Sequence, residues 1–289
     1  MVEKKTGRNR SQGWTHAKKS GHQNEEDFGK QLLGDDGFIK LLEIRKFSER
    51  SKVTPKIAVD GAKKVSSIFG DQTTSKIDLE IIWAEERAVR VSLKKSAGGQ
   101  VWLISMERFK KCLEHYEVKL PGGHTELALA LFIGGPNLDN IRAKFEKALA
   151  KDSIVRPKIF AQEVNQKRLV AESIQDSFPG AWEELMDYLG SNIELITNLS
   201  FGRGLAKSEK DWADFVVYNL AGAEQTFEIT HLAELSAKLV DSDPITAGPR
   251  NGGSTILLPT GFLQMHHPQG QNLLQFHHSY SKIQNLVDQ

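Results

Sequence analysis

The residues best suited to chemistry lie in two neighbouring apolar segments. Asp78 lies in KIDLEIIW (76–83), and Ser92 and Lys94 lie in AVRVSLK (88–94). In a strand, alternate residues share a face, so Ser92 and Lys94 point the same way, as Asp78 and Glu80 do. A carboxylate facing a lysine across two strands can hold a divalent metal ion and activate or position water. That chemistry suits metal-assisted phosphodiester hydrolysis.

An ordinary surface ion pair, worth under about 1 kcal/mol, is the alternative interpretation of the same residues. The neighbours of Asp78 favour the functional interpretation. Ile77, Leu79 and Ile81 make the strand apolar, and a charge in a central strand is costly without a partner. Glu25 is a further candidate ligand, because it lies on a predicted helix that precedes both strands.

The elements that must position these residues can be predicted from the sequence pattern. Asn24 is a plausible N-cap for a helix that ends near Gly34, and the polar residues 85–87 join the two apolar segments into a β-hairpin. A mixed α/β (α+β) fold follows. Other helices are predicted at 38–47, 107–116, 124–134, 137–150, 160–176, 180–196 and 230–239, and strands at 100–104, 212–220 and, as a small antiparallel sheet, 254–280.

The composition excludes several classes of protein. The 289 residues include 38 Lys+Arg and 37 Asp+Glu, and 39% are hydrophobic, as in globular proteins. No run of about 18 apolar residues predicts a membrane helix, and the N-terminus does not resemble a secretory signal, so a cytoplasmic protein is expected. The single cysteine, Cys112, excludes an internal disulfide framework and a cysteine zinc site. There is no GxxxxGK[ST] motif, which disfavours an ATP-driven enzyme.

Positive charge is concentrated near the N-terminus, where residues 4–19 hold six Lys/Arg and no acid. Segregated positive charge is what a phosphate-binding face needs, although a solvated basic arm would have the same composition. Candidate contacts to nucleic acid lie in this arm, after the hairpin strand, and in polar segments near the C-terminus. They are Lys18, Lys19, Ser20, His22, Lys95, Gln100, Arg250, Asn251 and His277. A zinc site built from the pairs at 266–267 and 277–278 ranks much lower.

The order Glu25, Asp78, then Ser92-Leu-Lys94 resembles the PD-(D/E)XK nuclease superfamily, specifically type II restriction endonucleases. The family core has a helix with Glu, a strand with Asp, and a strand with (D/E)-x-K. The phrases GWTHAKKSGHQNEEDF (13–28), SKIDLEII (75–82), VSLKKSAGGQVWL (91–103), DWADFVVY (211–218) and LLQFHHSYSKI (273–283) also resemble these enzymes. The spacing from Gly21 favours Glu25 over Glu26 as the helix carboxylate.

The resemblance implies a restriction-endonuclease-like core, a mixed sheet flanked by helices, with a small C-terminal β-sheet. The whole chain, 1–289, would be one domain, with a basic arm (1–20), a catalytic core (21–120) and recognition or dimerisation elements (121–289). It implies Mg²⁺ held by Asp78, Glu25 and the Leu93 backbone carbonyl, with Lys94 acting on water. Double-stranded DNA would be the substrate of a homodimer, with a cognate DNA methyltransferase as its genetic partner and no membrane association.

Two positions depart from the family pattern. Ser92 replaces the second acid, giving S-x-K, and a neutral hydroxyl is a poor metal ligand. Ile77 stands where the family has proline. These departures keep two alternatives open: a catalytically inactive, DNA-binding nuclease fold, and a repair nuclease without sequence specificity. Lys95 should point away from Lys94, which favours a phosphate or structural contact.

Overall fold

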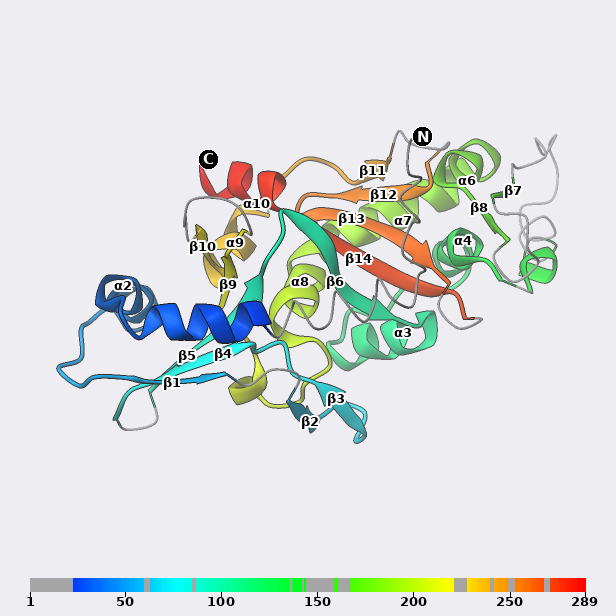
Figure 1. Cartoon of the computed structure of the whole chain (residues 1–289). Helices are drawn as coiled ribbons and strands as arrows, with labels where there is room; N and C mark the ends of the chain where they lie inside the picture. Colours follow the sequence, from blue (N-terminus) through cyan, green and yellow to red (C-terminus); the bar gives the residue numbers. More distant parts are fainter. Residues whose placement is uncertain are drawn as a thin grey trace, which may run out of the picture.

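A computed structural model describes residues 23–59, 63–84, 87–135, 137–141, 143, 159–160, 167–220, 228–239, 242–248, 253–267 and 271–289. Two five-stranded sheets, flanked by helices, form the framework (Figure 1). The predicted mixed α/β class is therefore confirmed. In the described part of the chain, no helix is both long and apolar enough to cross a membrane.

The first sheet contains the predicted hairpin. Its strand order is β1 (Lys56–Val59), β4 (Leu79–Ile82), β5 (Ala88–Lys94), β9 (Phe215–Tyr218) and β10 (Glu228–His231). Strands β5 and β9 are parallel, and the other neighbours are antiparallel. One face is covered by a helix over residues 23–32 and by α2 (Asp36–Phe47), through a core that includes Phe28, Leu42, Leu79 and Val91. The other face holds the alternate side chains, those of Glu80, Arg90 and Ser92.

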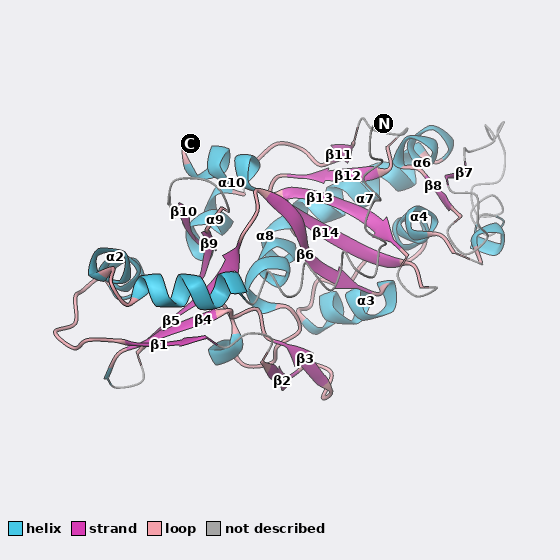
Figure 2. Ribbon diagram, viewed as in Figure 1, coloured by secondary structure: helices cyan, strands magenta, loops and turns pink. Residues whose placement is uncertain are grey.

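The second sheet is antiparallel throughout and is larger than the predicted C-terminal one. Its strand order is β11 (Thr246–Ala247), β12 (Thr255–Leu258), β13 (Gly261–His266), β14 (Leu273–Ser279) and β6 (Gly98–Ile104). Helices α3 (Met106–His115), α4 (His124–Ile133) and α7 (Pro179–Ser191) share its core (Figure 2). Phe276 packs there between Trp102 and Phe109, with ring centroids 5.3 and 5.8 Å away.

Consecutive strands of the chain enter different sheets. Strand β6 directly follows β5, yet it pairs with β14 at the other end of the chain. Strand β9 pairs with β5 although more than one hundred residues separate them in sequence. Both sheets therefore combine strands from before and after residue 120, so the predicted core (21–120) and recognition segment (121–289) are interleaved in space.

Several predicted elements were wrong in extent or type. Within 160–176, predicted as one helix, the described residues form the end of β7 (Ile159–Phe160), β8 (Arg168–Leu169), which pairs with β7, and α6 (Ala171–Ser177). The helix predicted at 180–196 divides at Asn192 into α7 and α8 (Ile193–Asn198), and a π-helical turn follows (Leu199–Arg203). The predicted helix at 230–239 begins only after β10, as α9 (Leu232–Lys238). Of the helix predicted at 137–150, residues 144–150 lie outside the described ranges.

The remaining elements are short. Strands β2 (Lys64–Ser66) and β3 (Gln72–Thr74) form a separate hairpin in a region predicted as loop with a short helix or strand. A single 3₁₀ turn, η4 (Glu209–Asp211), precedes β9, and α10 (Tyr280–Val287) follows β14.

Candidate active site

Asp78 lies immediately before β4, one residue outside the strand in which it was predicted. Its N–H still donates to the Val91 carbonyl oxygen of β5 at 2.9 Å, so its place beside β5 is fixed. The Oδ2 atom accepts a hydrogen bond from the Leu93 N–H at 2.6 Å and one from Ser92 Oγ at 3.4 Å. The carboxylate is thus held against the Ser92–Leu93 backbone, on the face away from the covering helices.

Lys94 reaches Asp78 through Ser92. Its Nζ donates to Ser92 Oγ at 2.7 Å and to the Leu93 carbonyl oxygen at 3.3 Å. The Ser92 hydroxyl therefore accepts from the ammonium and donates to the carboxylate, while its side chain is buried. Sequence alternation predicted that Asp78, Ser92 and Lys94 would meet on one face, and the structure brings them together.

Glu25 approaches the same point from the helix over residues 23–32. Asn219, which follows β9, donates its N–H to the Lys94 carbonyl oxygen at 2.8 Å and its side-chain amide to Asn24 Oδ1 at 3.3 Å. These contacts dock the start of the helix at the end of β5. The negative charge of Glu25 acts on Lys94, raising its pKa. Glu26 instead lines a surface hollow with Lys30 and Val59.

Burial and charge have opposing effects on the central pair. Burial raises the pKa of the Asp78 carboxyl, and Lys94 is the strongest influence in the other direction. Burial lowers the pKa of Lys94, whereas Asp78 and then Glu25 raise it. Each charge therefore depends on the other for its stability in this partly buried place.

Lys76 is a fourth titratable residue of the site, and the sequence analysis missed it. Burial, followed by the charge of Lys94, lowers the pKa of Lys76 to about 7, against the attraction of Asp78. Its Nζ donates to the Val101 carbonyl oxygen in β6. The signal was present in the sequence, because residues 76 and 78 share a face of an extended segment.

Two predicted DNA contacts, Gln100 and His277, lie opposite each other on β6 and β14. The pairing is irregular between Phe276 and His277, so Val101 stands as an extra residue in β6. Gln100 Oε1 accepts from Gln275 Nε2 at 2.6 Å, and Gln264 Nε2 contacts Gln275 Oε1 at 2.7 Å and His277 Nε2 at 3.0 Å. These four side chains form a polar row on the second sheet.

Of the remaining predicted DNA contacts, Lys95 alone lies among the described residues. Lys18, Lys19, Ser20, His22, Arg250 and Asn251 lie outside the described residues. Lys95 follows the last residue of β5 and is partly exposed.

The donor set can be compared with the needs of a magnesium ion. No group of three or more His, Cys, Asp or Glu side chains suited to a metal occurs among the described residues. Mg²⁺ needs fewer ligands from the protein. It is commonly bound by one or two carboxylates, and water and phosphate oxygens complete its coordination. Within the described part of the chain both hydrogen bonds to Asp78 end on Oδ2, which leaves Oδ1 available. The oxygen atoms of Asp78, Glu25 and the Leu93 carbonyl therefore suit Mg²⁺ better than a metal ion that is held by three histidine side chains.

No family model matches the chain, and no curated protein matches it in sequence. A solved structure described as "restriction endonuclease MspI in complex with its cognate DNA" is similar over 89% of this chain and 83% of that chain, with 11% identity and a TM-score of 0.45.

Proposed function

We propose that this chain is a Mg²⁺-dependent endonuclease that cuts double-stranded DNA at a short recognition sequence, as a type II restriction endonuclease does. One observation carries the proposal: the Lys94 ammonium is linked through Ser92 Oγ to the Asp78 carboxylate, and Glu25 acts on the same lysine. A merely structural ion pair would need neither the buried hydroxyl between the charges nor a second carboxylate from another element.

In this proposal each residue has one task. Asp78 and Glu25 would hold Mg²⁺ through carboxylate oxygens, with the Leu93 carbonyl as a further ligand. The ion would supply positive charge for a phosphate oxygen and a more acidic water when it is bound. The Lys94 ammonium, kept in place by Ser92 Oγ and the Leu93 carbonyl, would orient the attacking water and neutralise charge that develops on the phosphate. Ser92 would act as a positioning residue.

The biological setting belongs to the same proposal. A palindromic DNA site is matched by a two-fold symmetric homodimer, which would place one such site on each strand. The enzyme would act in the cytoplasm beside a methyltransferase that protects the same sequence.

The test is cleavage of phage or plasmid DNA with Mg²⁺ and with EDTA. Wild type should give discrete fragments only with Mg²⁺, and Lys94→Ala should lose at least about a hundredfold in rate. Lys40→Ala is the matched control, because that exposed lysine lies on α2, among the elements that cover the opposite face. Near-wild-type cleavage by Lys94→Ala, with its fold shown intact by circular dichroism, would refute the catalytic assignment. A smear in place of discrete bands would favour the non-specific repair nuclease.

A catalytically inactive DNA-binding protein is the second candidate. Ser92 favours it, because the hydroxyl supplies no negative charge where the family pattern has an acid. Intact DNA under all metal conditions, together with a gel shift, would support this candidate over the nuclease.

A further inference from the structure

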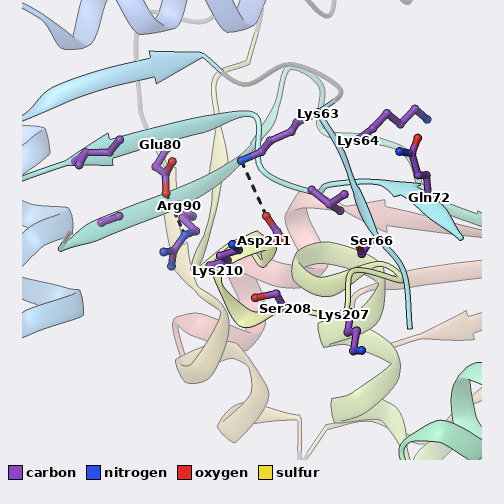
Figure 3. Close-up of a pocket in the computed structure, with 13 residues that line it drawn as sticks. Lys63, Lys64, Ser66, Gln72, Glu80, Arg90, Lys207, Ser208, Lys210 and Asp211 are labelled. Atoms are coloured by element: carbon purple, nitrogen blue, oxygen red, sulfur yellow. Dashed lines mark hydrogen bonds and ion pairs between the residues drawn. The ribbon is translucent and has the colours of Figure 1, made fainter. Parts of the chain in front are cut away.

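A basic pocket of about 980 Å³ lies beside the candidate active site. Its walls are the β2–β3 hairpin on one side and the segment from Lys207 to Asp211 on the other, and its floor is formed by β4 and β5 (Figure 3). None of the catalytic candidates lines it.

The floor of this pocket continues the face of the sheet that holds Asp78 and Lys94. Glu80 and Ile82 follow Asp78 at alternate positions, and their partners across the strand pair are Arg90 and Ala88. All four line the pocket. A long ligand bound at Asp78 could therefore extend along the sheet into the pocket without crossing to another face.

The pocket has surplus positive charge. Five Lys or Arg and two acids line it, and each acid has a basic partner. Glu80 accepts from Arg90 at 3.2 Å, and Asp211 lies 4.0 Å from Lys63, as the dashed lines of Figure 3 mark.

The surplus is provided by Lys64, Lys207 and Lys210. Lys64 donates to the neutral Thr74 hydroxyl at 2.8 Å, so its charge is not cancelled. Lys207 and Lys210 are exposed and form no ion pair with described residues. Lysines without an ion-pair partner around a hollow favour a ligand with several negative charges.

The two walls are fixed to each other before any ligand arrives. The Lys207 N–H donates to the Ser66 carbonyl oxygen at 3.0 Å, and the Ile68 N–H donates to the Leu205 carbonyl oxygen at 2.9 Å. Ser75 Oγ adds a bond to the Asp211 carbonyl oxygen at 3.1 Å. The lysines are thus carried by a preformed frame, which lowers the entropic cost of binding.

We propose that this pocket binds the phosphate backbone of the DNA strand cut at Asp78, through Lys64, Lys207 and Lys210. The inference rests on the proposed function, and it adds where the bound phosphates lie relative to the cleaved bond. Residues two and four places along a strand lie about 7 and 14 Å away. For a duplex whose axis follows the strand direction, the axial rise of about 3.4 Å per base pair makes these distances about two to four base pairs from the cleaved bond.

The first experiment measures binding of a 30-base-pair duplex in EDTA by fluorescence anisotropy at several salt concentrations. Each lost phosphate contact should reduce the salt slope by about 0.9 and weaken binding roughly tenfold at 100 mM salt. Lys207→Gln/Lys210→Gln should therefore lower the slope by about 2. The control is Lys40→Gln/Lys111→Gln, which removes two exposed lysines from α2 and α3 and should change neither value.

The second experiment maps the position. Neutral methylphosphonates are placed two to four nucleotides from the cut, on one side in one duplex and on the other side in a second duplex. One of the two duplexes should bind wild type more weakly than unmodified DNA, and the other should bind normally. The Lys207→Gln/Lys210→Gln variant should be insensitive to that change. An unchanged salt slope, or equal sensitivity of variant and wild type, overturns the pocket assignment while Mg²⁺-dependent cleavage by wild type still supports the nuclease. Binding with the expected slopes but no cleavage would reject the nuclease and keep the pocket as a DNA contact.

Discussion

His278 connects the two sheets close to Lys94, and it should make the fold sensitive to acid. Its Nδ1 lies 3.0 Å from the Tyr218 hydroxyl oxygen, and its side chain is only 3% exposed. Burial, followed by the charge of Lys94, lowers the pKa of His278 from 6.5 to about 3. The folded protein therefore keeps this imidazole neutral at pH values where the unfolded chain protonates it.

The size of the effect follows from the two pKa values. Between about pH 6.5 and pH 3 the unfolded state binds one more proton at this residue. The free energy of unfolding therefore decreases by about 1.4 kcal/mol for each unit by which the pH is lowered. Lowering the pH from 7.5 to 5 should cost about 2 kcal/mol through His278 alone. Above about pH 6.5 neither state binds the proton, and the effect disappears.

Urea unfolding of wild type and His278→Gln at pH 7.5, 6 and 5 measures this cost. Glutamine cannot titrate and can still hydrogen-bond with the Tyr218 hydroxyl, so the variant should lose about 2 kcal/mol less than wild type between pH 7.5 and pH 5. The lowered pKa values of His231 and His277 add acid sensitivity to both proteins. His115→Gln, an exposed site at the end of α3, should follow wild type. Equal losses in wild type and His278→Gln would refute the reasoning.

Four further predictions concern the site and the packing of the helices. Ser92→Asp adds a carboxylate beside Asp78 and should lower the Mg²⁺ concentration for half-maximal cleavage roughly tenfold; a folded but inactive variant would show instead that the hydroxyl bridge is required. Lys76→Met leaves the Val101 carbonyl without its donor and should cost about 1–2 kcal/mol in urea unfolding, whereas an unchanged midpoint would contradict that contact. Gly134→Ala should cost about 3 kcal/mol or more, because φ is 67° and the new Cβ would lie 2.0 Å from the Lys167 carbonyl oxygen. Gly190→Ala, at an open position in α7, should instead stabilise by about 0.5–1 kcal/mol, and thermal unfolding can compare the two.

The hairpin and its facing residues could be predicted because local alternation determines them. Asp78, Ser92 and Lys94 lie within one pair of adjacent strands, where the side-chain period of two fixes the shared face. The same holds for the C-terminal strands at 255–258, 261–266 and 273–279, whose apolar runs are separated by only a few residues in sequence. In both places the pairing partner is the next segment along the chain.

Partners that are distant in sequence could not be predicted. Nothing local to residues 98–104 shows that β6 leaves the first sheet to pair with β14. The helix predicted at 160–176 fails for a related reason: Arg168 and Leu169 are buried in the described structure and pair in a two-stranded sheet, so tertiary contacts override their helical composition. The buried Arg168 donates to the Ser254 carbonyl oxygen at 2.8 Å, a partner that no sequence pattern indicates.

The extra residue in β6, Val101, links the polar row to the candidate site, because its carbonyl oxygen accepts the hydrogen bond from Lys76. A one-residue shift moves a strand's side chains to the opposite face. With regular pairing Gln100 would share the face of Trp102 and point into the core, whereas the bulge at Val101 places it beside Gln275 and His277. The Val101 carbonyl at this bulge accepts from Lys76, two residues from Asp78. A change that displaces Lys76 should therefore disturb both the carboxylate face of the first sheet and the position of Gln100 on the second, although no described hydrogen bond joins Gln100 to Asp78.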